Sequence, residues 1–328
     1  MPFIVRRLVF YLVAAWVALT INFFIPRLIP GNAVQNVMAK FPNLQPSAYK
    51  ALEALLGVGH PGSIWHQYVT YLDDIFHFNF GTDVSQYPAQ VSSLLVQTLP
   101  WTITLVGVAT VIAFLIGTAL GIVAGWRHGG TLDRVLPGLM FLQAIPYFFF
   151  ALILVELLAI KTQVFPSGQG YADGLIPGWH WDFISSALYH SALPALTIVL
   201  TSIAGWMLQM RNVMITTTGE DYVIAAQAKG LPNRRVIYTY AARNALLPQL
   251  QGFGLAVGFV VSGAIVMEIV FGYPGIGLLL LNAVTSNDYP LMQAIFLVIT
   301  FAVLLANLVV DMIIVVADPR ARRREATS

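Results

Sequence analysis

Cysteine is absent from this chain of 328 residues, and charged side chains are scarce. The lack of cysteine excludes a disulfide framework, a thiolate nucleophile and a cysteine metal site. Asp, Glu, Lys and Arg make up 10% of the residues, against about 25% in an average soluble domain. So few charges cannot form a water-soluble surface, and they also exclude a disordered chain. Hydrophobic residues make up 58%, so the composition predicts a polytopic membrane protein.

Six apolar windows are long enough to cross a bilayer, which takes about 20 predominantly apolar residues. They are residues 8–28, 99–126, 135–160, 188–210, 250–271 and 291–317. The first window follows Arg6-Arg7, but it is too long for the apolar core of a secretory signal, and no small-residue cleavage motif comes after it. We therefore expect an all-α protein with six transmembrane helices, and a single membrane domain over residues 1–328.

Lysine and arginine are distributed unevenly between the windows. If the N-terminus is cytoplasmic, thirteen of these seventeen residues lie in inner segments. The other four are Arg27, Lys40, Lys50 and Lys161, in outer segments. Positive residues concentrate on the cytoplasmic side of membrane proteins. The pattern therefore predicts that both termini are cytoplasmic.

A long outer loop, residues 30–98, joins the first two windows. Residues 45–56 have a proline at their second position, and their pattern predicts a short helix. Farther on, large apolar residues are interspersed with polar ones: Tyr68, Tyr71, Ile75, Phe76, Phe78 and Phe80. This pattern fits an amphipathic segment on the membrane interface, a docking surface for an external partner, or both. The loop also holds His60, His66 and His77, whose spacing matches no metal site, so we expect none.

Two features lie inside the windows. Gly117 and Gly121 have the GxxxG spacing that permits close helix packing, although glycine is also simply common in membrane helices. The acids Glu156, Glu268 and Asp311 are costly in a membrane and have either structural or functional roles. Each fits an interfacial or helix–helix hydrogen bond. For Glu268 the alternative is a place on a translocation pathway or gate, together with the rigid Gly- and Pro-rich corner at Phe271, Pro274 and Gly275.

The loop over residues 211–248 is cytoplasmic in this topology. Thr218 or Gly219 can cap a helix, residues 222–229 continue it, Gly230 suits its C′ position and Pro232 ends it. The helix has small residues at Ala225, Ala226 and Ala228. Two turns are too few for a stable helix in water, so it must pack either on its own chain or in the socket of a partner.

The residues of this loop resemble the cytoplasmic "EAA" loop of ABC-importer permeases, in the branch that handles peptides, nickel complexes and some oligosaccharides. The matching positions are Asp221-Tyr222-Val223-x-Ala225-Ala226-x-Ala228-Lys229-Gly230-Leu231 and Arg243-Asn244-Ala245-Leu246-Leu247-Pro248. Further matches are Ile29-Pro30-Gly31, Gly121-x-x-Ala124-Gly125-x-Arg127-x-Gly129 with Asp133, His190-x-x-x-Pro194, Glu268-x-x-Phe271-x-x-Pro274-Gly275 and Asp318-Pro319-Arg320. The sequence departs from the pattern at Asn32, usually aspartate, and at Ile224, where the wider superfamily has glutamate.

The resemblance implies the fold of a type I ABC-importer permease in a prokaryotic plasma (inner) membrane. It also implies four kinds of partner: a second related permease, two ATPase subunits, an extracytoplasmic binding protein and membrane lipid, with no nucleic acid. The coupling residues it implies are Asp221, Tyr222, Ala225, Ala226, Ala228, Lys229, Gly230 and Leu231. Arg234 and Arg235 either pair with acids of an ATPase or only follow the positive-inside bias.

The chain itself is not expected to be an enzyme. It contains no Gly-x-x-x-x-Gly-Lys-[Ser/Thr] motif, so ATP and Mg²⁺ are expected in the partner ATPases and no cofactor on this chain. Peptides are the expected substrate, with oligosaccharides or a nickel chelate as alternatives. An ion-coupled secondary carrier is the alternative of another class, but the sequence shows neither inverted repeats nor a proton path.

Overall fold

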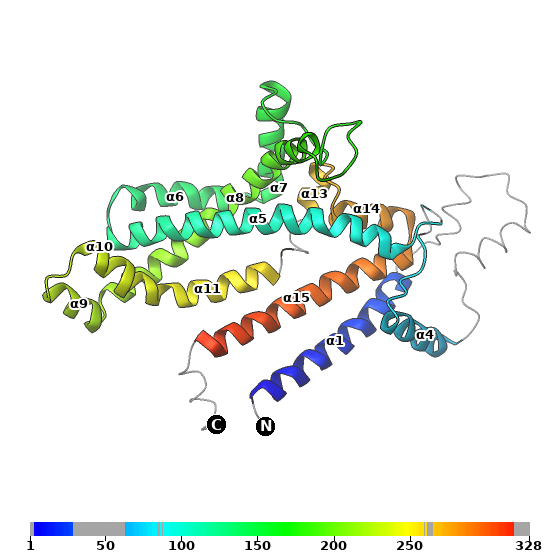
Figure 1. Cartoon of the computed structure of the whole chain (residues 1–328), viewed down its shortest axis with the longest axis horizontal. Coiled ribbons are helices and arrows are strands. Elements are labelled where there is room, and N and C mark those ends of the chain that lie inside the picture. The colour runs from blue at the N-terminus through cyan, green and yellow to red at the C-terminus, as the bar shows by residue number, and fades with distance from the viewer. Residues whose placement is uncertain are drawn as a thin grey trace, which may run out of the picture. The chain divides into compact units, whose positions relative to one another are not determined.

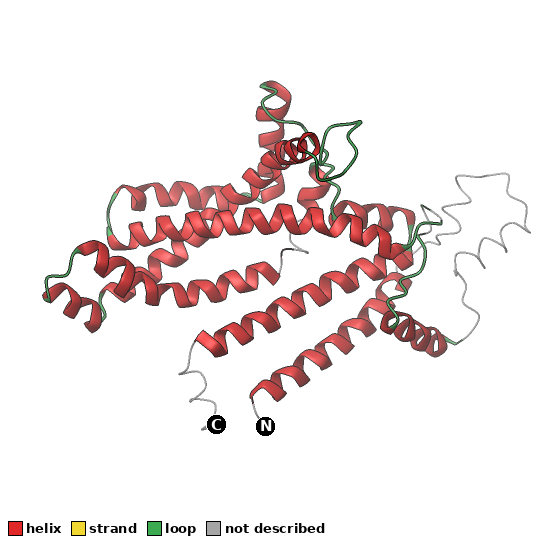
Figure 2. Ribbon diagram, in the orientation of Figure 1, coloured by secondary structure: helices red, strands yellow, loops and turns green. Residues whose placement is uncertain are grey.

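The computed structural model describes residues 3–28, 63–83, 86, 88–258, 260 and 265–317. Within these ranges the chain is mainly helical (Figures 1 and 2), with loops such as residues 162–180 and an antiparallel bridge between Thr82 and Gln90. It divides into two compact units. The first comprises the chain up to Thr102 and residues 274–304, and the second comprises residues 103–273 and the chain from Leu305.

The first unit joins the N-terminal helix to the beginning of the last one. It contains α1 (Phe3–Leu28), α4 (Ile64–Phe76), α14 (Ile276–Ser286) and the first parts of α5 (Val91–Trp126) and α15 (Tyr289–Ala317). Asn22 of α1 is buried and donates from Nδ2 to the carbonyl of Gln293 in α15, at 2.8 Å. The Thr102 hydroxyl of α5 accepts from the backbone N–H of Ile276, at the first turn of α14. Buried polar side chains thus connect helices that are far apart in the sequence.

The second unit contains the rest of α5 and α15 and all helices from α6 to α13. In chain order these are α6 (Thr131–Ala144), α7 (Tyr147–Leu154), η1 (Val155–Lys161), α8 (Trp181–Thr218), α9 (Asp221–Ala228), α10 (Asn233–Arg235), η2 (Val236–Ala242), α11 (Arg243–Gly258) and α13 (Ile265–Val270). One core of this unit unites α5, α6 and α8 through Ala124, Leu136 and Met207, all buried. The two η segments are π-helices, a form found mostly as short bulges and often at functional sites.

Four predicted windows fall on continuous helices long and apolar enough to cross a membrane. The qualifying stretches are Arg6–Ile25, Val91–Trp126, Trp181–Thr218 and Tyr289–Val309. The helix α8 has 38 residues and is about 57 Å long at 1.5 Å per residue, against a hydrocarbon core of about 30 Å. The helix is therefore longer than a perpendicular crossing of the hydrocarbon core requires, which apolar windows alone could not predict.

The third window, 135–160, is not one continuous helix, and this expectation is wrong. The helix α6 ends at Ala144, and a new helical segment begins at Tyr147 at an angle of 96° to it. Ile145 between them is extended, with φ −75° and ψ 127°. The cause is Pro146, whose ring disfavours the helical conformation of the preceding residue. The fifth window, 250–271, includes residues outside the described part, so a continuous fifth span stays a prediction.

Close packing at the GxxxG motif is confirmed, and a third glycine extends it. A β-carbon added to Gly117 would lie 2.6 Å from the Trp206 Cβ, and one at Gly121 would lie 2.6 Å from the Met207 carbonyl oxygen. At Gly125 the same atom would lie 2.5 Å from the Met214 Cβ. These separations are far below van der Waals contact. The glycines therefore let α5 and α8 approach along the same face for two turns.

Alanine at Gly121 should destabilise the protein, whereas alanine at Gly107 of the same helix should not. The added methyl at Gly121 meets backbone of α8, and overpacking of this kind costs about 1–3 kcal/mol. At Gly107 a β-carbon meets nothing within 4 Å, so the higher helix propensity of alanine should stabilise by up to about 1 kcal/mol. Thermal unfolding of both variants in the same detergent measures the effects. Equal melting temperatures would contradict the packing argument.

Candidate functional site

The helix α8 runs on through the first part of the segment predicted as a cytoplasmic loop. It continues past Met210 to Thr218, and only Gly219 and Glu220 separate it from α9. The first two helical turns of the predicted loop are therefore part of α8, and the place where the chain leaves the membrane stays a prediction. Figure 1 shows α9 and α10 beyond the ends of α8 and α11; a short turn joins α8 to α9, and α10 continues through η2 into α11 without a break. The small helix α9 is thus carried at the end of a long one.

The predicted helix at 222–229 is present as α9, with a different start. Thr218 and Gly219 belong to the end of α8, and the N-cap of α9 is Glu220. Gly230 occupies the predicted C′ position with φ +71°. Its N–H donates to the Gln227 carbonyl at 2.9 Å, and the Leu231 N–H donates to the Ala226 carbonyl at 3.4 Å. This pair of bonds is the Schellman ending, which favours glycine at the left-handed residue.

The inner side of α9 is built into the core of the second unit. Val223 is 0% exposed and Ala226 is 3% exposed. They pack in one cluster with residues of α5, α8, η2 and α11, namely Ile122, Met210, Met214, Val236, Ala241, Ala242 and Ala245. Most of the contacting side chains are alanine or methionine, so α9 lies close to its support. This burial supplies the stability that a two-turn helix lacks by itself.

The outer side of α9 carries exposed apolar residues. Ala225 and Ala228 are exposed, and Ile224 is 50% exposed. At 100° per residue these three lie on the side away from Val223 and Ala226. The prediction of one small-residue face including Ala226 is therefore wrong, because Ala226 points into its own chain. Ile224, noted above only as a departure from the family pattern, has the largest of these three exposed side chains.

The other predicted coupling residues surround this outer face. Asp221 opens α9 and is exposed, Tyr222 is 40% exposed, and Lys229 is the exposed C-cap. Leu231 is half-buried and packs against the core cluster. Arg234 and Arg235 form the exposed end of the three-residue helix α10. The structure thus brings an apolar strip and a group of cationic side chains to the same end of the unit.

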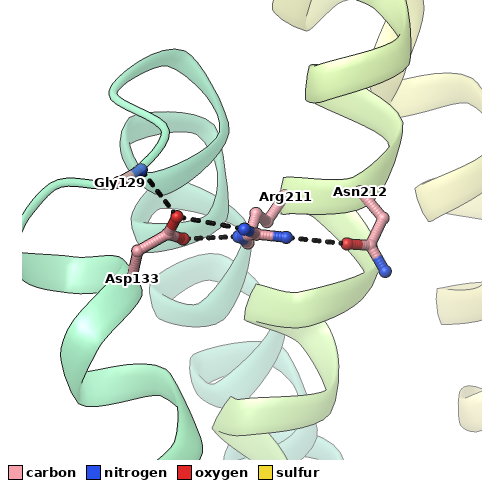
Figure 3. Close-up of polar contacts among 4 residues, drawn as sticks. All are labelled: Gly129, Asp133, Arg211 and Asn212. Atoms are coloured by element: carbon pink, nitrogen blue, oxygen red, sulfur yellow. Dashed lines mark hydrogen bonds and ion pairs between the residues drawn. The ribbon is translucent and has the colours of Figure 1, made fainter.

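A bidentate ion pair, which the sequence did not predict, lies near the end of α8 that leads into α9. Asp133 of α6 accepts from Nε of Arg211 of α8 at 2.5 Å and from its Nη2 at 3.0 Å (Figure 3). The backbone N–H of Gly129, at φ +79°, donates to the same carboxylate at 2.8 Å. Arg211 also donates from Nη1 to the Asn212 side chain. The family pattern included Asp133, but nothing in the sequence identified Arg211 as its partner.

The predicted gate residues are divided between the two units. In the second unit, Glu268 and Phe271 are buried, and the Phe271 carbonyl accepts from the Gln169 N–H at 2.7 Å. A β-carbon at Gly168 would lie 2.5 Å from that carbonyl oxygen, so the segment that joins η1 to α8 fits tightly against the corner. In the first unit, Pro274 is half-buried and Gly275 is the N-cap of α14. A pathway role for these residues stays a prediction.

The aromatic stretch of the outer loop forms α4, and part of it packs on its own chain. The Tyr68 hydroxyl lies 2.7 Å from the Thr20 hydroxyl of α1, and Asn22 donates to the Tyr71 hydroxyl at 3.0 Å. Burial raises the pKa of Tyr71 to about 12, so this hydroxyl stays protonated at physiological pH. Phe76 and Phe78 are exposed and remain available to the membrane interface or to a partner. Residues 30–62, with His60 and the predicted helix at 45–56, lie outside the described residues.

Comparison with known proteins identifies the class. A family model described as "Binding-protein-dependent transport system inner membrane component" matches residues 117–323. The chain therefore belongs to this family and is a permease subunit of a transport system. The dipeptide transport system permease protein DppB of Escherichia coli (strain K12) is 30% identical over 345 positions, covering 99% of this chain and all of the relative.

Two further relatives are of the same kind. The oligopeptide transport system permease protein AppB of Bacillus subtilis (strain 168) is 29% identical, covering 92% of each chain. The di/tripeptide transport system permease protein DppB of Pseudomonas aeruginosa (strain UCBPP-PA14) is 30% identical, covering 99% of each chain. The likeness spans the full membrane domain and includes the N-terminal region that the family model leaves out.

Valine at Gly230 should impair transport while the protein still reaches the membrane. The left-handed conformation costs non-glycine residues about 1–2 kcal/mol, and more when they are β-branched. The end of α9 would then lose its Schellman bonds and change direction. Gly219, with φ −81°, provides the control as Gly219→Ala, because an added β-carbon there would make only an ordinary van der Waals contact, 3.5 Å from the Thr216 carbonyl oxygen. Substrate uptake at matched membrane levels is the measurement, and normal uptake by Gly230→Val would contradict a role for this helix end.

Proposed function

We propose that this chain forms half of the translocation pathway of an ATP-driven ABC importer for peptides, and that α9 is the element held by a partner ATPase subunit. The observation that carries the proposal is the two-sided character of α9. Its inner side is locked into the core, while Ile224, Ala225 and Ala228 present an apolar surface to the aqueous side. Exposed apolar strips on a protein surface mark interaction sites, and small residues allow a partner to approach closely.

The expected mechanism is alternating access driven from outside the chain. Two ATPase subunits bind ATP and Mg²⁺ and close on each other, and each grips the α9 helix of one permease. The permeases then rearrange and open toward the outer side, where a binding protein delivers the peptide. The second permease is a related chain. The sequence contains no phosphate-binding Gly-x-x-x-x-Gly-Lys motif, which supports the assignment of ATP hydrolysis to separate subunits.

The proposed topology has six spans, with both termini in the cytoplasm of a prokaryotic cell. It rests on the excess of lysine and arginine in the inner segments. In this orientation α9 and α10 are cytoplasmic, and Arg234 and Arg235 are available to acidic groups of the ATPase. The segment around α4 is extracytoplasmic, where its exposed aromatic residues can meet the binding protein. The bent pair α6 and α7–η1 forms the third span.

Peptide is the proposed substrate because the relatives that match nearly the whole chain are permease proteins of dipeptide, di/tripeptide and oligopeptide transport systems. Selection among peptides is assigned to the binding protein. The direct test is to measure peptide binding by the partner binding protein, and then uptake of the same peptide by the complete complex in vesicles.

The chain should be inactive alone. In lipid vesicles it should hydrolyse no ATP, since it has no nucleotide motif. With the second permease, the two ATPases and the binding protein, hydrolysis should appear and should increase when peptide is added. Phosphate release is the measurement. ATP turnover by the purified lone chain, free of ATPase contaminants, would contradict the assignment.

Glutamate at Ala225 should weaken binding of the ATPase far more than glutamate at Gln227. Ala225 lies on the outer face of α9, where a bulky charge in a close-packed groove costs several kcal/mol, of order 3. Gln227 is exposed on the flank of the helix, and the same change there should cost within about 0.5 kcal/mol. Co-purification of the ATPase subunits with each variant is the measurement.

Ala226 cannot serve in the same test, because it is buried in its own chain. Glutamate at that position should instead lower the stability of the permease itself. Equal retention of the ATPases by the Ala225 and Gln227 variants would show that the outer face of α9 is not the contact surface.

A further inference from the structure

We propose that the Asp133–Arg211 ion pair fastens the α5–α6 hairpin to the end of α8 and transmits movement of α9 into that hairpin. This inference rests on the proposed function, because it needs α9 to be moved by an ATPase. It makes Asp133 and Arg211 positioning residues for transport. They act through the helices they join and touch neither substrate nor ATPase.

The geometry of the pair resists displacement in more than one direction. Both carboxylate oxygens of Asp133 are engaged by the fork of one guanidinium, and the Gly129 N–H holds one of them from the other side (Figure 3). Such paired bonds fix orientation as well as distance. The side chains are only 18% exposed for Arg211 and 11% for Asp133.

The position of Arg211 places the pair between the moving part and the membrane helices. Arg211 is seven residues before the end of α8, and α9 follows after Gly219 and Glu220. At the same level, a β-carbon added to Gly125 of α5 would lie 2.9 Å from the Arg211 carbonyl oxygen. The residue is therefore held by α5 through its backbone and by α6 through its side chain. The two helices are joined to each other by the short turn at 127–130.

The two contacts at Arg211 have different mechanical consequences. The glycine contact is steric: it sets how closely α8 approaches α5, but it makes no directional bond between the two helices. The ion pair is directional, so rotation of α8 must either carry α6 with it or break the bonds. Removal of the ion pair should leave the helices packed through the glycines and through the apolar core of α5, α6 and α8, but it should weaken the coupling of their movement near the end of α8. This separates a transmission role from a purely structural one.

The test uses the complete complex in vesicles and measures ATP hydrolysed per labelled alanyl-alanine imported. Asp133→Asn and Arg211→Gln should each raise this ratio several-fold above that of the wild-type complex. The double variant should be no worse than either single one, because both remove the same link. Arg134→Gln, at the exposed neighbouring arginine of α6, is the matched control and should leave the ratio unchanged.

A second experiment controls for folding, and the absence of native cysteine makes it possible. In Asp133→Cys/Arg211→Cys, assembled with cysteine-free partner subunits, the ratio should be high when the thiols are free. A bifunctional thiol reagent about as long as the arginine side chain should restore coupling in the same protein. Wild-type ratios in the single variants, additive effects in the double variant, or no recovery on cross-linking would each overturn the proposal.

These failures differ from a failure of the proposed function. If only the ion-pair proposal fails, the wild-type complex imports the dipeptide with tight coupling, and the variants do the same. If the proposed function fails, the wild-type complex itself shows no hydrolysis dependent on the loaded binding protein, or the ATPases do not associate through α9.

Discussion

The close approach of α5 to α8 determines the arrangement of the second unit. Three glycines at four-residue intervals leave no room for a β-carbon, so the two backbones lie in direct contact over two turns. This contact fixes where the last part of α8 lies, and α9 follows within two residues of its end. Met210 and Met214, adjacent to the glycine contact, also form part of the cluster on which α9 rests. The same helix surface therefore serves the membrane packing and the support of α9.

The support of α9 explains how a short helix can transmit force. A helix of eight residues does not hold its shape in water, yet α9 has buried residues at Val223 and Ala226 and a Schellman ending at Gly230. Its interior is shared with α5, α8, η2 and α11. A push on its outer face is therefore distributed over several helices at once. The supporting side chains are mostly small, so α9 packs closely on its neighbours. Close-packed interiors transmit strain.

Part of this arrangement could be predicted from the sequence, because it depends on local rules. Hydropathy located the four continuous spans, and the Gly230–Pro232 sequence located the end of α9 and its left-handed residue. The bend at Ile145–Pro146 was also encoded locally, by the proline. A hydropathy window measures only how apolar a segment is, so it cannot show that the helix changes direction there. The true length of α8 was not predictable from hydropathy, because its last two turns are stabilised by Met214 and Thr217 packing in the core rather than by lipid.

The features that sequence reasoning missed depend on contacts between distant segments. The partner of Asp133 is 78 residues away, and no spacing rule connects α6 to the end of α8. Likewise, three alanines on a short helix look equivalent in sequence, whereas the fold buries Ala226 and exposes Ala225. Val223 shares the inner side with Ala226, and the packing of these two residues in the core cluster fixes the rotation of α9. Ile224 is then forced outward, and the burial of one side of α9 produces the apolar surface on the other.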